Sequence, residues 1–278
     1  GLPRLSAALL LTALAVLTLA AARPHATVAE LRREGTVVLA VDTSTSMTAA
    51  DLAPTRIEAA RAAAKAFVAQ APGSIRIGVV SFGGGAVVLQ APTTVREDVV
   101  AAVDRLVPQG GTSIGQGIFA ALQSITGGTL RLTEEQLGGD LDEVDIGYYG
   151  SSVLVMFTDG EDTSRLDPLR LAELAGTAGV RIHTVGLGDP QGTTVTVDGF
   201  TVATRLDEKL LRDVSQTTGG SYFAAPDEAA LAAVYGGIDL QWTAEPARTE
   251  VTALVAALGL VLLVAGAGTG IVRTGRVI

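Results

Sequence analysis

Apolar and polar positions follow two different periods along the middle of the chain. Strand-length runs rich in apolar residues recur at Thr36 to Val41, Ser74 to Phe82, Ser152 to Phe157 and Arg181 to Val185. Two of them, the first and the third, are almost wholly apolar, which is typical of strands buried on both faces of a parallel sheet. A short run, Ala86 to Gln90, follows a glycine turn and is expected to pair beside the second strand.

Segments with helical periodicity separate these strands. They are Arg56 to Ala71, Arg96 to Leu106, the stretch from "GGTSIGQG" through Ile125, Leu166 to Ala178, Asp207 to Thr218 and Asp227 to Trp242. Strands that alternate with helices of ten or more residues indicate βαβ units. The expected fold class is therefore α/β, with a doubly wound, mostly parallel sheet covered by helices on both faces.

Two stretches depart from this alternation. Thr193 to Val202 alternates across an Asp198-Gly199 pair, which is a strong hairpin signal. Glu134 to Asp145 carries six acidic residues and two adjacent glycines. Calcium binding is one interpretation of that stretch, but the spacing is not that of a calcium-binding loop, so we expect a solvated surface loop.

Both ends of the chain carry long apolar segments. Leu5 to Ala22 and Val251 to Val272 contain no charged residue. Each is long enough, or nearly so, to cross the ~30 Å hydrocarbon layer as a helix, and we predict two transmembrane helices. For the first, Ala20 to Ala22 also fits a signal-peptidase site; since the chain opens at Gly1 without methionine, we expect sequence upstream. For the second, a buried core helix is the alternative.

Charge is distributed unevenly between these ends and the middle. All 29 acidic residues lie between the apolar segments, with all but Arg4, Arg273 and Arg276 of the 20 basic residues. Because basic residues favour the cytoplasmic side, we expect the acidic domain outside the cytoplasm of a bacterial plasma membrane, although Arg23, Arg32 and Arg33 weaken this orientation. An acidic domain also argues against nucleic-acid binding. The absence of cysteine excludes disulfides and thiolate metal sites.

Polar oxygen-bearing side chains follow the expected strands. Asp42, Ser44 and Ser46 come after the first strand, Thr112 lies in a Gly-Gly-Thr loop, and Asp159 follows the strand that ends at Phe157. Open parallel sheets bind ligands at the carboxyl ends of their strands, where all three loops should meet. Hydroxyl and carboxylate oxygens suit a hard cation such as Mg²⁺. With little directly bound negative charge, such a cation would stay electrophilic and could take a carboxylate from another molecule.

Together these motifs resemble the von Willebrand factor A domain. Asp-x-Ser-x-Ser after the first strand, Gly-Gly-Thr, and Thr-Asp-Gly after a central strand match its metal-ion-dependent adhesion site, over a domain from about Thr36 to Trp242. The resemblance implies that Ser44, Ser46 and Thr112 contact Mg²⁺, or another divalent cation such as Mn²⁺ or Ca²⁺. It implies that Asp42 and Asp159 act directly or through water, and that a protein partner supplies an acidic residue to the metal.

A narrower resemblance surrounds that domain. The stretches "LAAARP", "DLAPTRIEAARAAAKAFV", "PTTVREDV" and "TDGEDT", with the closing apolar segment, are similar to bacterial membrane proteins of the Bat (aerotolerance) type. This resemblance implies membrane helices that flank the A domain. It also implies a MoxR-type AAA+ ATPase as a partner and an envelope-stress or chaperone-like role.

Two other classes of function remain open. A metal-independent scaffold in a membrane complex is one alternative, since serines and threonines after strands are also ordinary caps. An aspartyl-phosphate enzyme with Asp42 as nucleophile is the other. Enzymes of that type use a second acid where this chain has Ser44, and a lysine, but only Lys65 and Lys209 are present. We therefore expect a binding protein and no enzymatic activity.

Several further residues have plain structural interpretations. Met47 is expected to fill the core, and His183 is expected to be packed inside its strand. Glu161 and Asp162 are read as solvated loop charges. Trp242, before the second apolar segment, could anchor at a membrane interface or pack on the domain.

Overall fold

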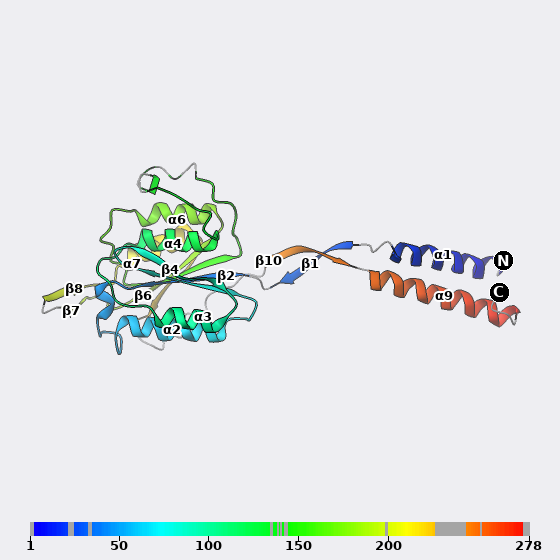
Figure 1. Cartoon of the computed structure of the whole chain (residues 1–278), viewed down its shortest axis with the longest axis horizontal. Coiled ribbons are helices and arrows are strands. Elements are labelled where there is room, and N and C mark those ends of the chain that lie inside the picture. The colour runs from blue at the N-terminus through cyan, green and yellow to red at the C-terminus, as the bar shows by residue number, and fades with distance from the viewer. Residues whose placement is uncertain are drawn as a thin grey trace. The chain divides into compact units, whose positions relative to one another are not determined.

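The computed structural model describes ten stretches of the chain (Figure 1). They are residues 3–21, 25–32, 35–133, 136–137, 139, 141, 144–197, 200–225, 243–250 and 252–274. The chain divides into two compact units, one of residues 33–243 and one that combines residues 1–32 with 244–278. Each is described by itself.

A mostly parallel sheet forms the centre of the larger unit. Its strands are β2 (Thr36–Asp42), β3 (Arg76–Phe82), β4 (Ala86–Thr93), β5 (Ser152–Thr158), β6 (Arg181–Leu187) and β9 (Tyr222–Ala225). Among the described residues their order is β4-β3-β2-β5-β6-β9, and only β4 runs antiparallel to its neighbour. The doubly wound α/β sheet predicted from the sequence is confirmed.

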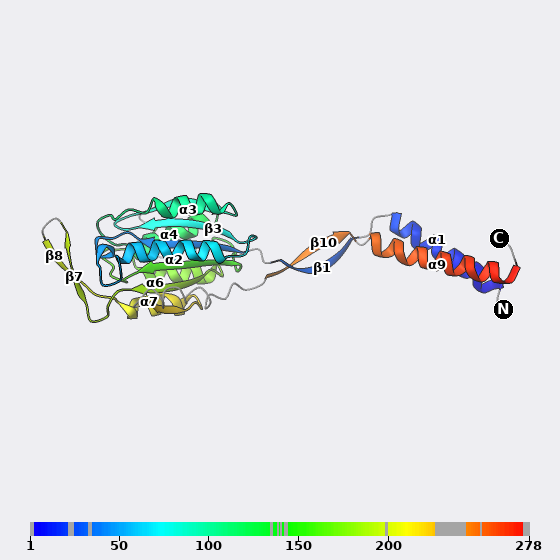
Figure 2. The same ribbon diagram turned by 90° about the horizontal axis from the view of Figure 1, so that it is seen from below.

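Helices cover both faces of this sheet (Figures 1 and 2). α2 (Arg56–Gln70) and α3 (Arg96–Asp104) lie on one face, and α4 (Ile114–Ile125), α6 (Pro168–Thr177) and α7 (Glu208–Thr217) lie on the other. Successive residues of a strand point to opposite faces, so Val37 and Leu39 of β2 join the first core while Val38 and Ala40 join the second. This double burial explains why β2 is apolar throughout.

Side-chain caps decide where the helices begin. Asp167 accepts a hydrogen bond from the main-chain nitrogen of Leu169, and Pro168 occupies the first turn of α6. Asp207 accepts from the nitrogen of Leu210 at the start of α7. Both helices are therefore slightly shorter than the periodicity predicted, because a capping residue lies outside the helix that it stabilises.

The predicted hairpin is present, and three strands among the described residues were missed. β7 (Thr193–Val197) pairs with β8 (Phe200–Thr204), and Val197 lies opposite Phe200 across the predicted two-residue turn, which itself lies outside the described residues. β9 has only four residues, too few for a periodic signal. β1 (His25–Arg32) and β10 (Thr243–Glu250) pair with each other, and neither shows an apolar run. The helix predicted over 227–242 lies outside the described residues.

Two leucines within the acidic stretch from 134 to 145 belong to the domain core, whereas five of its six acidic residues lie outside the described residues. Leu137 and Leu141 are both more than nine-tenths buried and join the core between the sheet and α4 and α6. Asp145 is exposed and its carboxylate accepts from the nitrogen of Gly147. The prediction of a solvated loop is therefore incomplete, because Leu137 and Leu141 are buried.

The smaller unit contains two helices that pack together. α1 (Pro3–Ala21) and α9 (Thr252–Thr274) overlap the two apolar segments of the sequence. Ala13, Ala20 and Gly259 are buried, whereas Leu11 and Val261 are 68% and 64% exposed. In the part of the chain that the structure describes, no helix is long and apolar enough to span a membrane.

Candidate metal-binding site

The sheet order reverses between β2 and β5, and the candidate residues gather at this point. β2 ends at Asp42, and Asp159 comes directly after β5, which pairs with β2 in parallel. Ligands of open α/β sheets bind where the strand order reverses, beyond the carboxyl ends of the strands. The two carboxylates thus lie at the position that the fold class reserves for a ligand.

Asp42 is fully buried and both of its carboxylate oxygens are engaged. Oδ1 accepts from the main-chain nitrogen of Ser44 at 2.7 Å, and Oδ2 accepts from the hydroxyl of Thr158 at 2.6 Å. Burial, and then the nearby charge of Asp159, raises the pKa of Asp42 to about 7. Without a bound cation, burial and the charge of Asp159 therefore disfavour ionisation of Asp42 near neutral pH.

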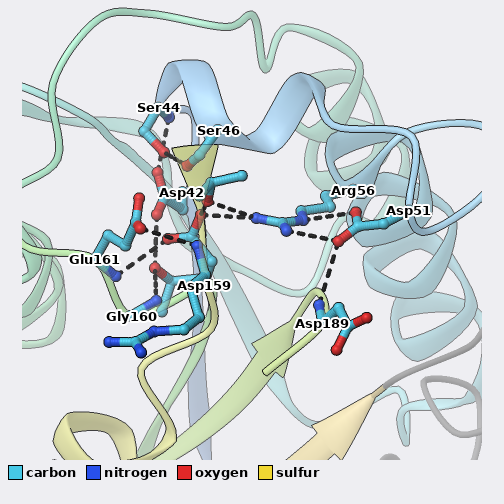
Figure 3. A network of polar contacts seen from close by, with 12 residues as sticks. Asp42, Ser44, Ser46, Asp51, Arg56, Asp159, Gly160, Glu161 and Asp189 are labelled. Atoms are coloured by element: carbon cyan, nitrogen blue, oxygen red, sulfur yellow. Dashed lines mark hydrogen bonds and ion pairs between the residues drawn. The ribbon is translucent and has the colours of Figure 1, made fainter. Parts of the chain in front are cut away.

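Ser44 and Ser46 bring two hydroxyls together beside Asp42 (Figure 3). Their Oγ atoms lie 3.0 Å apart, where the chain enters the short helix η1 (Thr45–Thr48). Ser44 is buried and Ser46 is partly exposed. Met47 is fully buried in the core, as predicted, and holds this turn against the domain.

Thr112 is held by its main chain in the loop before α4. Its nitrogen donates to Oγ1 of Thr163, and its carbonyl oxygen accepts from both the nitrogen and Oγ1 of Thr163, each at 3.0 Å. Thr163 belongs to the loop that carries Asp159. On the other side, the nitrogen of Gln109 donates to the carbonyl oxygen of Thr43. Hydrogen bonds thus link all three loops predicted from the sequence.

Asp159 is also fully buried, and the guanidinium of Arg56 lies against its carboxylate. Its Oδ2 accepts from Nη1 of Arg56 at 2.9 Å and from Oγ1 of Thr204 at 3.1 Å (Figure 3). Its Oδ1 accepts from the nitrogen of Glu161 at 3.2 Å. Asp159 therefore joins the β5 loop, the start of α2 and the end of β8.

Arg56 is the main residue of this site that sequence reasoning missed. Its side chain is completely buried, and Nε and Nη2 donate to the two carboxylate oxygens of Asp51 at 2.8 and 2.6 Å. The available signal was weak: a basic residue at the first position of a helix, where the helix dipole favours acidic residues. Thr204 gave no signal, because it comes from a hairpin distant in sequence.

Two predictions about nearby residues have different outcomes. His183 is 3% exposed in β6, and its Nδ1 accepts from the nitrogen of Ser221, so the prediction of a packed histidine is confirmed. Glu161 is partly buried, and its Oε1 accepts from the nitrogen of Arg205 at 2.9 Å. It therefore ties the Asp159 loop to the end of the hairpin instead of being only a solvated charge.

The donor set fits a hard cation. Two buried carboxylates and the nearby serine hydroxyls offer only oxygen, the ligand that Mg²⁺ prefers. Within the described residues, no group of three or more His, Cys, Asp or Glu side chains could hold a metal ion. Groups of three or more such side chains are typical of zinc sites. A site that combines two carboxylates with hydroxyls is of a different kind. The pKa of Asp42 is raised by burial and then by the charge of Asp159, and a bound cation would oppose both effects by stabilising the ionised carboxylate.

Comparison with known families agrees with the fold. The model of the von Willebrand factor type A domain matches residues 37–161, a range that contains all five candidate residues. The protein is thus one that carries a von Willebrand factor A domain. A UPF0353 protein of Nocardia farcinica is 33% identical over 97% of this chain and 81% of its own length. One of Mycobacterium marinum is 33% identical over 94% and 76%. The chain belongs to the UPF0353 family.

Solved structures share the same fold at lower identity. An aerotolerance-related membrane protein from Bacteroides fragilis aligns with a TM-score of 0.59 at 22% identity, over 74% of this chain and 96% of its own. BatB from Bacteroides thetaiotaomicron aligns with a TM-score of 0.59 at 23% identity, over 73% and 97%. The expected resemblance to Bat-type A domains is confirmed at the level of fold.

Proposed function

We propose that this protein is a membrane-associated binding module that holds a protein partner through a divalent cation, with Mg²⁺ the first candidate. Ser44, Ser46 and Thr112 would bind the cation through their hydroxyl oxygens, and Asp42 and Asp159 would bind it directly or through water. A bound cation would supply an electrophilic position for a carboxylate of the partner. The five residues of this chain would keep the cation at the carboxyl edge of the sheet, where the partner can reach it.

One observation carries this proposal. Asp42 and Asp159, which are 117 positions apart in the sequence, are both fully buried at the point where the strand order reverses. Two adjacent buried carboxylates cost free energy unless a positive charge compensates them. Arg56 supplies one such charge to Asp159, whereas Asp42 has only neutral donors among its hydrogen-bond partners. A divalent cation would supply positive charge to Asp42 as well.

The same geometry argues against phosphoryl transfer. Lys65 pairs with Asp104, and Lys209 pairs with Asp213 on the surface of α7. Arg56 contacts Asp159, but its side chain is completely buried and its three nitrogens all donate to protein oxygens. Stabilising a transferring phosphoryl group requires positive donors that are directed at it and not already engaged elsewhere. We therefore propose a binding protein and not an enzyme.

The surface of the helix pair supports membrane association. Gly259 packs against Leu17, and Gly266 packs against Leu10, so small residues let the two helices approach closely. Leu14 and Val264 are 60% and 62% exposed on the outside. Small residues inside and aliphatic residues outside are typical of helices that pack in lipid. With the acidic domain outside the cytoplasm, this arrangement would present the metal site to an extracytoplasmic partner.

A MoxR-type AAA+ ATPase is proposed as a functional companion on the Bat resemblance alone. The similar Bacteroides fragilis structure is described as that of an aerotolerance-related membrane protein, which is compatible with an envelope-stress role. A carboxylate on a protein of that complex would be the group bound at the metal site.

A pull-down from solubilised bacterial membranes tests the proposal. The full chain serves as bait in Mg²⁺ and in EDTA, beside Thr112→Ala. Thr177→Ala is the matched control, because it lies at the end of α6, which leads into the start of β6 at the opposite edge of the sheet. A partner retained by the wild type and by Thr177→Ala in Mg²⁺, but lost in EDTA and with Thr112→Ala, would support the proposal. Equal retention under all conditions would instead favour a metal-independent scaffold.

A further inference from the structure

We propose that Arg56 is a positioning residue that makes cation binding depend on the acidic ligand. This inference rests on the proposed metal-dependent function and concerns how the site is regulated. Arg56 contributes its charge to the same carboxylate, Asp159, that would serve the cation. As a result, the site would hold a cation weakly alone and firmly when a carboxylate is bound with it.

The contacts of Arg56 fix its position. Its Nε and Nη2 grip Asp51 through two parallel hydrogen bonds, and its Nη1 donates to Asp159 and to Thr204 (Figure 3). A bidentate carboxylate pair is the most directional contact a guanidinium makes. Asp51 in turn accepts from the main-chain nitrogen of Asp189 at 3.2 Å. Asp51 thus fixes one side of the Arg56 guanidinium, and the other side contacts Asp159.

This arrangement limits how Asp159 can serve a cation. Because Oδ2 is occupied by Arg56 and Thr204, only Oδ1 is left, and Oδ1 already accepts from the nitrogen of Glu161. Asp159 can therefore contribute one oxygen, directly or through water. A bidentate contact would require Oδ2 to lose its contact with Arg56 or its hydrogen bond from Thr204.

The balance of buried charge points the same way. Asp42, Asp159 and Arg56 are each completely buried and together carry a single net negative charge when ionised. Asp51, which pairs with Arg56, is a fourth charged residue, but it is not counted in this buried set because its side chain reaches solvent. A divalent cation would leave this buried set with a net positive charge. One carboxylate from a partner would neutralise it, so cation and partner should each strengthen binding of the other.

Binding of Mn²⁺ to the purified full chain measures this coupling directly. The signal of free Mn²⁺ in electron paramagnetic resonance gives its Kd, alone and with a capped Gly-Glu-Gly peptide or the neutral capped Gly-Gln-Gly. For the wild type, we expect only the glutamate peptide to tighten Mn²⁺ binding, by about fivefold or more. For Arg56→Gln, we expect Mn²⁺ alone to bind about fivefold or more tighter, and the gain from the peptide to shrink.

Two matched pairs of variants separate this effect from general electrostatics. Arg61→Gln removes the same charge from α2 at a residue that contacts Glu58 and Leu106 instead of the site, and it should behave as the wild type. Asp51→Asn leaves Arg56 with Asp159 as its carboxylate partner, so Mn²⁺ should bind more weakly and gain more from the peptide. Asp189→Asn removes an equal charge that does not pair with Arg56. It should therefore change neither the affinity for Mn²⁺ nor the gain in affinity from the peptide.

The outcomes distinguish the inference from the function on which it rests. Arg56→Gln that keeps its circular dichroism but binds Mn²⁺ no tighter than the wild type would overturn the role of Arg56 alone. If Arg56→Gln does not fold, equal Mn²⁺ affinity of Asp51→Asn and Asp189→Asn would overturn it. A wild type that binds no Mn²⁺, or binds it equally with Thr112→Ala, would overturn the proposed function as well.

Discussion

The hydroxyl of Thr158 donates to Oδ2 of Asp42 at 2.6 Å, and this contact joins the ends of β2 and β5 across 116 positions of sequence. Both residues are completely buried. The same hydroxyl accepts from the main-chain nitrogen of Gly160, at the start of the loop that carries Asp159. The side chain of Thr158 therefore fixes the loop after β2 and the loop after β5 relative to each other.

Thr158→Val should destabilise the protein although it preserves volume and branching. The change leaves a buried carboxylate oxygen and the nitrogen of Gly160 without a partner, which costs about 1 to 3 kcal/mol. Thr158→Ser keeps the hydroxyl and should recover most of that free energy of unfolding. Urea denaturation of both variants measures the difference. Equal stability of the two variants would mean that the hydroxyl contributes nothing.

The raised pKa of Asp42 predicts an unusual dependence of stability on pH. In the metal-free protein, the pKa of Asp42 is about 7, whereas in the unfolded chain its carboxyl has the ordinary pKa of 3.8. The folded state thus holds more protons between these values. Its free energy of unfolding should fall as pH rises from about 4 to about 7, by an amount on the order of a few kcal/mol.

Thermal unfolding in EDTA at several pH values tests this dependence, with Asp42→Asn as the control. Asp42→Asn removes the titrating group, so it should flatten the curve and unfold at a higher temperature than the wild type at pH 8 in EDTA. Mg²⁺ should reverse that order, because only the wild type can offer the ionised carboxylate. If the stability of the wild type did not fall more between pH 4 and pH 7 than that of Asp42→Asn, the assignment would be contradicted.

Gly160 is expected to tolerate no side chain. It has a φ of +79°, and a Cβ there would lie 2.7 Å from the carbonyl oxygen of Asp207, the residue that caps α7. Gly160→Ala should therefore combine backbone strain with a collision that displaces the start of α7. Gly127→Ala provides the comparison, since its φ of +65° is similar but the space around it is open.

The two alanine variants separate strain from collision. Gly127→Ala should cost about 1 to 2 kcal/mol, the value expected for a left-handed backbone alone. Gly160→Ala should cost clearly more, as measured by chemical denaturation. If the two costs were the same, the close approach of α7 to Gly160 would have no energetic consequence.

Close packing of α1 on α9 should depend on Gly259. A Cβ at this position would lie 2.8 Å from the side chain of Leu17, so Gly259→Leu should force the helices apart. Because the chain has no cysteine, spin labels can be placed at Leu11 and Val264, which are exposed. Double electron–electron resonance should then report a longer or broader distance. Gly268→Leu, which faces open space, should leave the distance unchanged, and equal effects would argue against this packing.

Most of the sheet could be predicted because its strands are buried on both faces. Val37 to Val41 is apolar without interruption, and Val153 to Phe157 is the same, since each residue meets one of two cores. The four residues of β9 are too few to show a period. β1 and β10 contain several charged residues, and their pairing joins parts of the chain more than two hundred positions apart. Local patterns carry no information about such contacts.

The candidate site divides in the same way between what the sequence by itself determined and what only the tertiary structure decided. Asp42, Ser44, Ser46, Thr112 and Asp159 could be placed together because parallel strands end at one edge of a sheet. The contacts of Asp159 with both Arg56 and Thr204 could not be predicted from the sequence. A buried guanidinium takes whichever carboxylates surround it, and here its partners lie 5 and 103 positions away. Strand and helix periods determine where elements run, whereas the compensation of buried charge depends on which side chains the finished fold brings into contact.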